Sequence, residues 1–208
     1  MIILGITVGM VFVAHPDMRP FIAVAAAGVI LIVIGVLFLV ATTKNSDSFR
    51  VMRVLVWLQP EKYSDEGGYQ TLQALYAIGS GGLFGRGLGN SIQKLGSVPE
   101  AQNDMIFSII CEELGVFGAI MVLILFGMLL YRLLFIAQNA PDLYGSLVVS
   151  GIFAHIALQV ILNVMVVINC IPTTGITLPF ISYGGTSVLF LMAEMGLALG
   201  VSSKIKNC

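Results

Sequence analysis

Residues 143–193 read LYGSLVVSGIFAHIALQVILNVMVVINCIPTTGITLPFISYGGTSVLFLMA and contain no Asp, Glu, Lys or Arg. A helix needs ~20 apolar residues to cross the ~30 Å hydrocarbon core of a bilayer, so this stretch is too long for one crossing. Its middle, from Asn169 to Gly185, carries the proline, glycine and polar residues that typically form turns. The stretch therefore predicts two membrane-spanning helices, at about 145–168 and 185–203, joined by a polar turn.

The whole chain shares this apolar character. Of its 208 residues, 58% are hydrophobic and 10% are charged, whereas roughly 25% of residues are charged in an average soluble domain. The mean hydropathy of +0.99 also excludes disorder, which requires low hydrophobicity. A net charge of −1 offers nothing to attract nucleic acid, and three cysteines without CxxC spacing predict neither a disulfide framework nor a zinc site.

Further spans are predicted upstream. Residues 20–41 include a run from Phe21 to Ala41 without a charge, and residues 105–131 form another long apolar segment. Residues 1–14 are uncharged but too short for a full crossing, so we expect a partial span, the end of a helix that began earlier. The predicted fold class is all-α, a polytopic membrane helical bundle with four full spans and a partial N-terminal one.

The segment 42–104 concentrates the charge of the chain. It holds 12 of the 21 charged residues, six of each sign, together with several aromatic residues that would let it pack. Structureless loops of this length are uncommon, so we expect short helices in it at the membrane surface. Long loops count little in the positive-inside rule, which weakly favours an extracytoplasmic position for this one.

Two features of this loop admit alternative interpretations. Residues 79–89 contain six glycines beside Arg86, with Lys94 following. Such a stretch could present backbone N–H groups to a phosphate or could simply be a turn or a close backbone contact, and we weigh these equally. Arg50 and Arg53 would share a helical face near Trp57, where anchoring at the membrane interface is the ordinary explanation.

Acidic residues follow at the end of the loop. Ser97 and Glu100 have the spacing of a capping box, which predicts a helix that starts here and runs into the membrane. Asp104 would then lie on the same side as Glu100 near the helix mouth. The helix dipole alone favours acidic residues in a first turn, so this pattern does not require catalysis.

Glu112 and Glu113 would lie deeper in the same helix, where an unpaired charge is costly. At least one of them should face a polar cavity within the membrane. Its walls would include Gln159 and Asn163, and the candidate partners at helical spacing on the later span are Ser146, Ser150, His155, Gln159 and Asn163. The alternative is that these polar groups only hold the helices together.

Several motifs in order resemble the SEDS family, which includes FtsW, RodA and SpoVE. They are GYQ at 68–70 with Gln73, GRGLGNSIQK at 85–94, PEAQND at 99–104, EELG at 112–115 and PTTGITLPFISYGG at 172–185. The stretch at 89–94 makes the resemblance closest to FtsW and SpoVE.

The resemblance carries expectations about topology and activity. Family members have about ten spans, so the chain would correspond to the C-terminal half, starting in the sixth span. Segment 42–104 would be the large extracytoplasmic loop of a bacterial plasma-membrane protein, with a cytoplasmic C-terminus. Family members polymerise lipid II, an undecaprenyl-pyrophosphate-linked disaccharide-peptide. They work with a class B penicillin-binding protein and other divisome or elongasome membrane proteins.

The resemblance also implies residue roles. The family's catalytic aspartate corresponds to Asp104, which would act as general base on the sugar hydroxyl that attacks. Cationic side chains would neutralise the pyrophosphate, and the substrate-binding candidates are Lys94, Arg86, Arg50, Arg53 and Glu100. No cofactor is certain, although a divalent cation such as Mg²⁺ or Mn²⁺ could share this work.

This chain departs from the family pattern around the aspartate. It has Gln102 and Asn103 where His-Thr is usual, Met105 where Phe is usual, and Cys111 where glycine is common. The carboxylate is kept, so the base would survive. Two other functions remain open: a lipid II flippase, and a non-catalytic scaffold that activates the penicillin-binding protein.

Overall fold

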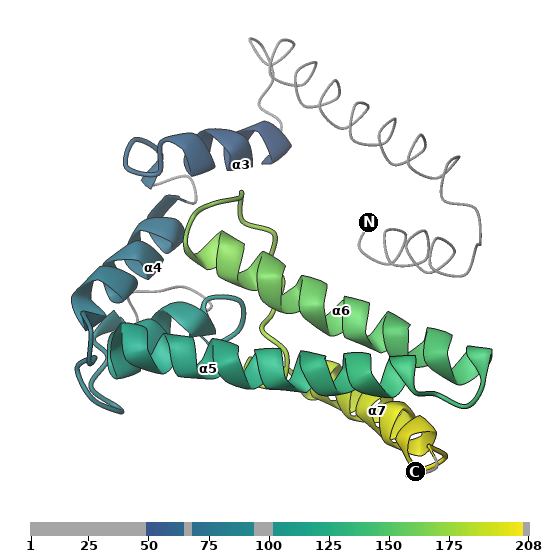
Figure 1. Ribbon diagram of the computed structural model, residues 1–208. Helices are drawn as coiled ribbons and strands as arrows, with labels where there is room; N and C mark the ends of the chain where they lie inside the picture. Colours follow the sequence, from purple (N-terminus) through teal and green to yellow (C-terminus); the bar gives the residue numbers. More distant parts are fainter. Residues whose placement is uncertain (1–48, 65–67, 94–101, 206–208) are drawn as a thin grey trace. The chain divides into compact units, whose positions relative to one another are not determined.

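The computed structural model describes residues 49–64, 68–93 and 102–205 (Figure 1). Regular structure in the described ranges is entirely helical, which confirms the all-α fold class. The helices are α3 (Phe49–Leu58), α4 (Gly68–Gly81), α5 (Ile106–Gln138), α6 (Leu143–Val167) and α7 (Gly185–Ser202). The chain divides into two units, Met1–Val54 and Leu55–Cys208, and the second contains helices α4 to α7 and the end of α3. The spans predicted at about 1–14 and 20–41 lie outside the described residues.

Helices α5, α6 and α7 are long and apolar enough to cross a membrane. Helix α6 begins at Leu143, where the side chain of Asp142 accepts a hydrogen bond from the N–H of Gly145 at 3.1 Å and caps the helix. Its buried residues recur every three or four positions from Gly145 to Val167 and form one face. Helix α5 runs beside α6, and α7 packs against both (Figure 1).

Helix α5 consists of two helical segments joined at Gly115, which has φ 71° and ψ −172°. The segment before Gly115 is buried on nearly all sides. After Gly115, only one stripe is buried, at Ala119, Phe126, Leu133 and Ala137, while most other side chains are exposed. The spacings of seven, seven and four residues along this stripe place these four side chains on one face of the helix.

The glycine-rich loop after α4 fills the break in α5 with backbone hydrogen bonds. In an unbroken helix, the N–H groups of residues 116 and 117 would bond to the carbonyls of 112 and 113. Here all four groups bond to the loop instead, at 3.0–3.2 Å. The pairs are Val116 N–H to Gly82, Phe117 N–H to Leu83, Arg86 N–H to Glu112 and Gly87 N–H to Glu113, each to the carbonyl oxygen.

The start of α5 differs from the prediction. Residues 102–105 form turns and α5 begins at Ile106, so a helix does not run unbroken from Ser97 into the membrane. Asp104 therefore lies in a turn and not in the predicted helix, while Ser97 and Glu100 of the predicted capping box lie outside the described residues. The physical reason is that the carbonyl groups of residues 102–104 accept hydrogen bonds from α6 and from the loop after it. In a continuous helix these carbonyls would bond to N–H groups of α5 instead.

The end of α5 also lies beyond the predicted residue 131. Arg132 is exposed and its guanidinium lies 5.9 Å from the ring centre of Phe135. A long charged side chain can pack its apolar part along the helix and keep its charged end exposed, so a single arginine does not end a membrane helix.

The short helices expected within residues 42–104 are present as α3 and α4. Helix α4 packs against the buried segment of α5, and the backbone of Gly81 lies so close to Cys111 that no side chain would fit there. The end of α3 is tied to the loop after α6, because Trp57 Nε1 donates to the carbonyl of Asn169 at 3.0 Å. These contacts place α4 and the end of α3 near the C-terminal end of α6, where the polar turn begins.

Candidate active site

Asp104 lies in the turn that immediately precedes α5. The next residue, Met105, is buried with 1% of its surface exposed. Its carbonyl accepts a hydrogen bond from the Ser108 hydroxyl at 2.7 Å. The Asp104 side chain is half-buried and its Oδ1 lies 3.4 Å from Nε2 of Gln70 on α4. The carboxylate therefore stays accessible while its backbone is fixed.

Asn163 of α6 fixes that backbone. Its Nδ2 donates to the Asp104 carbonyl at 2.8 Å and to the Ile176 carbonyl at 2.7 Å. The side chain is fully buried on the packed face of α6. One amide therefore joins the turn before α5 to the loop between α6 and α7.

Ser182 and Tyr183 make the same connection from the loop side. The Ser182 hydroxyl donates to the carbonyl of Asn103 at 2.6 Å and accepts from the N–H of Leu178 at 2.7 Å. The N–H of Tyr183 donates to the carbonyl of Gln102 at 2.8 Å. Residues 102–104 thus bond through all three of their carbonyls, which is why they do not continue α5 toward its N-terminus.

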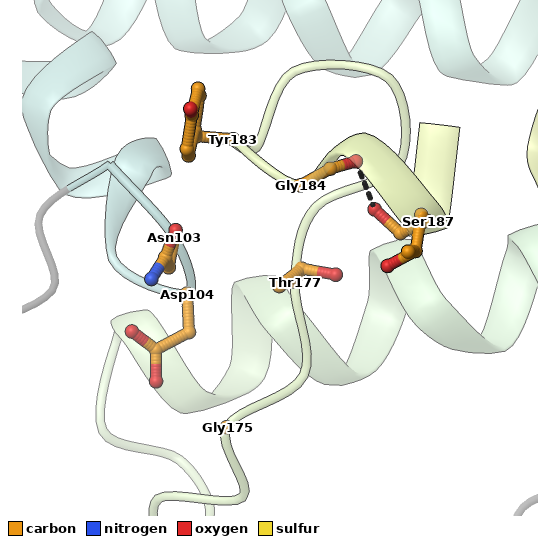
Figure 2. Close-up of a pocket in the computed structure, with 8 residues that line it drawn as sticks. Asn103, Asp104, Gly175, Thr177, Tyr183, Gly184 and Ser187 are labelled. Atoms are coloured by element: carbon orange, nitrogen blue, oxygen red, sulfur yellow. Dashed lines mark hydrogen bonds between the residues drawn. The ribbon is translucent and has the colours of Figure 1, made fainter. Parts of the chain in front are cut away.

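A pocket of about 400 Å³ lies between these segments (Figure 2). Asn103 and Asp104 lie on one side of it, Thr177, Gly184 and Ser187 lie on the other, and Tyr183 stands above. The remaining lining residues are Gly175 and Thr186. Asp104 is the one charged side chain in a lining otherwise made of hydroxyl, amide and glycine residues, a composition suited to a hydroxyl-rich ligand.

A second hollow of about 460 Å³ shares Tyr183 and Gly184 with this pocket. Its lining includes the apolar side chains of Ile106, Ile181 and Val188. A polar pocket and a mainly apolar one therefore meet at the same loop.

Glu112 has different partners from those predicted. Glu112 is fully buried, and its carboxylate accepts from the Ser91 hydroxyl and from the Ile92 N–H, the latter at 3.2 Å. Arg86 Nη1 lies 3.5 Å from Glu112 Oε1. The expectation that the later span supplies the partners was wrong for Glu112, because the break at Gly115 turns this part of α5 toward the glycine-rich loop.

Two other polar residues of α6 bond to the neighbouring helices. The Ser146 hydroxyl donates to the Ala137 carbonyl at 2.8 Å, and His155 Nδ1 lies 3.0 Å from Glu194 Oε2 on α7. Gln159 is half-buried one turn before Asn163. The interpretation that such groups hold helices together describes Ser146 and His155.

The glycine-rich loop shows the close backbone packing that was one of its two interpretations. A Cβ atom at Gly85 would collide with the backbone of Glu113, and one at Gly115 would collide with the backbone of Leu83 and Gly85. Both glycines also have positive φ, which other residues adopt at a cost. The glycines here serve to bring two backbones together.

The basic candidates are placed as follows. Arg86 is 39% exposed beside Glu112 and is not among the residues that line the Asp104 pocket. Arg53 lies on an exposed face of α3. Lys94, Glu100 and the side chain of Arg50 lie outside the described residues.

Glu113, the second predicted intramembrane glutamate, is half-buried, and its carbonyl accepts a hydrogen bond from the N–H of Gly87.

A cluster of His, Cys, Asp or Glu side chains could hold a divalent cation by itself. Within residues 49–64, 68–93 and 102–205, no three His, Cys, Asp or Glu side chains come together as a metal site. Mg²⁺ is commonly held by one or two carboxylates together with the phosphates of a substrate, which requires no such cluster, so the divalent cation stays a prediction.

Residue-by-residue reasoning missed the groups that shape the pocket. Gln70, Thr177, Ser182 and Tyr183 carry no charge and have no spacing that signals chemistry. The available signal was their membership of the motifs at 68–70 and 172–185.

Comparisons with known proteins agree with this arrangement. The model of the FtsW/RodA/SpoVE family, described as cell cycle protein, matches residues 1–207. Stage V sporulation protein E of Bacillus subtilis is 44% identical over 201 residues, which cover 97% of this chain and 53% of that protein. The probable peptidoglycan glycosyltransferase FtsW of the same organism is 40% identical, over 88% of this chain and 45% of that protein.

Solved structures show the same likeness. A chain from a study of polymerization and crosslinking by a peptidoglycan synthase complex superimposes with a TM-score of 0.67 at 29% identity. That match covers 96% of this chain and 53% of the other. A mutant of the Thermus thermophilus rod shape determining protein RodA superimposes with a TM-score of 0.50 at 30% identity, over 75% and 54%. The chain thus spans about half the length of the relatives it matches.

Proposed function

The chain belongs to the FtsW/RodA/SpoVE family of cell cycle proteins, and from that premise we propose that it carries the active site of a peptidoglycan glycosyltransferase. The substrate would be lipid II, and Asp104 would be the general base. The observation that carries the proposal is the position of Asp104. Its carboxylate borders a hydroxyl-lined pocket while its backbone is fixed by the buried Asn163.

The reaction would use that geometry in one displacement. Asp104 would take the proton from the 4-hydroxyl of the acceptor sugar as this oxygen bonds to the anomeric carbon of the donor. The bond from that carbon to the pyrophosphate would break, and the lipid pyrophosphate would leave with the electron pair. The second carboxylate of a glycosidase is unnecessary, because pyrophosphate leaves without being protonated by an acid.

The two adjoining hollows suit the two parts of such a substrate. The pocket at Asp104 would take the sugar, whose hydroxyls match Thr177, Ser187 and the amide of Asn103. The apolar hollow beyond Tyr183 would take isoprenoid carbons next to the pyrophosphate. Neutralisation of the pyrophosphate would fall to Lys94, Arg86, Arg50 and Arg53. Of these, Arg86 is not among the residues that line the Asp104 pocket, and Lys94 and the side chain of Arg50 lie outside the described residues.

The proposal includes orientation and partner. The Asp104 turn would face the outside of the plasma membrane, where glycan is assembled, and the C-terminus would face the cytoplasm. The protein would act with a class B penicillin-binding protein that crosslinks the new strands. Such a partner is supported by the likeness to a chain of a peptidoglycan synthase complex that coordinates polymerization and crosslinking.

The test is Asp104→Asn in the full-length protein reconstituted with purified lipid II. We expect the polymerisation rate to fall by about 10²–10⁴, the usual contribution of a general base, with lipid II binding retained. Glycan products are measured by gel electrophoresis of labelled lipid II. The matched control is Asp142→Asn, because asparagine caps a helix about as well as aspartate and this residue lies at the other end of α6.

Polymerisation at the normal rate by Asp104→Asn would overturn the proposal. If this variant instead still moved labelled lipid II across vesicles, the flippase would be favoured. Complementation of a depleted strain by the same variant would favour the scaffold.

A further inference from the structure

Three large apolar side chains project from the glycine-rich loop into open space. Leu83, Phe84 and Leu88 are 69%, 86% and 75% exposed, and we call them the loop tip. An exposed cluster of this kind in a protein marks an interaction surface. The backbone beneath it is fixed by the hydrogen bonds to α5, so the loop tip is presented at a defined place.

That place is the beginning of the exposed segment of α5. Residues 116–138 extend ~34 Å at ~1.5 Å per residue, which matches the ~30 Å hydrocarbon core of a bilayer. The loop bonds to the N–H groups of Val116 and Phe117, in the first turn of this segment. The loop tip therefore lies at the level where the membrane-spanning part of α5 starts.

The surface around the loop tip is continuous with the exposed apolar surface of α5. Val116 and Phe117 are 43% and 64% exposed, and exposed apolar side chains follow along the helix apart from its single buried stripe. Behind the loop tip, Arg86 pairs with the buried Glu112, and its guanidinium remains partly exposed. Apolar side chains beside a partly exposed arginine are the composition of a membrane-interface anchor.

We propose that Leu83, Phe84 and Leu88 insert into the interfacial region of the lipid bilayer beside α5. Interfacial segments bury apolar side chains ~5–10 Å into the boundary between headgroups and acyl chains. The anchor holds the glycine-rich loop, and with it the buried segment of α5 that follows the Asp104 turn, at a fixed depth. This inference concerns the placement of the loop and does not depend on the reaction proposed above.

The experiment places a tryptophan in the loop tip and measures its quenching by lipid. Phe84→Trp is made in a Trp57→Phe background, with any other tryptophan of the full-length protein replaced, and the protein is reconstituted in phosphatidylcholine–phosphatidylglycerol nanodiscs. We expect brominated acyl chains to reduce its fluorescence as strongly as that of Phe117→Trp, and aqueous acrylamide to quench it weakly. Leu88→Trp is a second reporter in case the first variant does not fold.

The matched control is Glu61→Trp, at an exposed position before α4 that we expect in water. It should show the opposite pattern, with quenching by acrylamide and none by brominated lipid. The proposal is overturned if the loop-tip tryptophans behave like this control. It is equally overturned if neither quencher reaches them, because they would then be covered by protein.

Discussion

At the scale of single residues, Asn163 connects the two segments that form the candidate site. Its side chain is fully buried and bonds to two backbone carbonyls that lie 59 and 13 residues away in the sequence. An asparagine amide offers two N–H donors on one nitrogen, which suits two neighbouring carbonyls. Neither a serine nor an aspartate could make both bonds.

Asn163→Ala is therefore expected to lower both stability and activity. Two part-buried carbonyls lose their donor, and the loss of each bond costs up to ~3 kcal/mol in the free energy of unfolding. Because Asp104 would lose its fixed position, the polymerisation rate should fall by more than the affinity for lipid II. Thermal unfolding in nanodiscs and steady-state kinetics measure the two effects.

The control for this prediction is Asn139→Ala. Asn139 Nδ2 also donates to a backbone carbonyl, that of Phe135 at 2.8 Å, but this bond is exposed to solvent. Surface changes of this kind stay within about ±0.5 kcal/mol. Equal losses in the two variants would show that burial of the Asn163 bonds has no special effect.

At the scale of elements, the break in α5 determines where the glycine-rich loop and Glu112 lie. Gly115 ends one helix and begins another, and the loop satisfies the four backbone groups that the break leaves free. Gly85 and Gly115 approach each other because neither has a Cβ atom. The buried carboxylate of Glu112 is then within reach of Ser91, Ile92 and Arg86.

Gly115→Ala should strongly destabilise the protein. The positive φ costs ~1–3 kcal/mol for a residue with a side chain, and the collision of the new Cβ with Leu83 and Gly85 adds to it. Gly127→Ala in the same helix meets no atom within 4 Å and should be neutral or stabilising by ~0.5–1 kcal/mol. Melting temperatures of the two variants in nanodiscs test this, and similar values would refute the role of the break.

At the scale of the whole second unit, the elements that form the candidate site lie at one end of a membrane-length bundle. The loop that ends α6 and begins α7 bonds to the Asp104 turn, so these segments lie at the same end. The connection from α5 to α6 and the residues after α7 lie at the other end, where the Ser146 hydroxyl bonds to Ala137. The site therefore belongs to one face of the membrane.

This arrangement makes the proposed orientation testable. In a background free of other cysteines, Thr174→Cys should react with a membrane-impermeant maleimide in intact cells, because it is exposed on the loop of the site. Lys204→Cys, exposed after α7, should react only after the cells are permeabilised. The reverse pattern would place the Asp104 pocket in the cytoplasm and contradict extracytoplasmic glycan synthesis.

The sequence by itself determined the membrane-length helices, the short helices before them and the family, because uncharged runs and ordered motifs are local properties of the chain. It also singled out Asp104, although only by resemblance. It could not place the break in α5 or the partners of Glu112, because a φ of 71° at Gly115 is stable only when the loop supplies its hydrogen bonds. Nor could it show that Asn163 and Ser182 hold the Asp104 turn, since these bonds join backbone carbonyls that any residue would have. Such contacts depend on which backbones meet, and only the tertiary structure decides that.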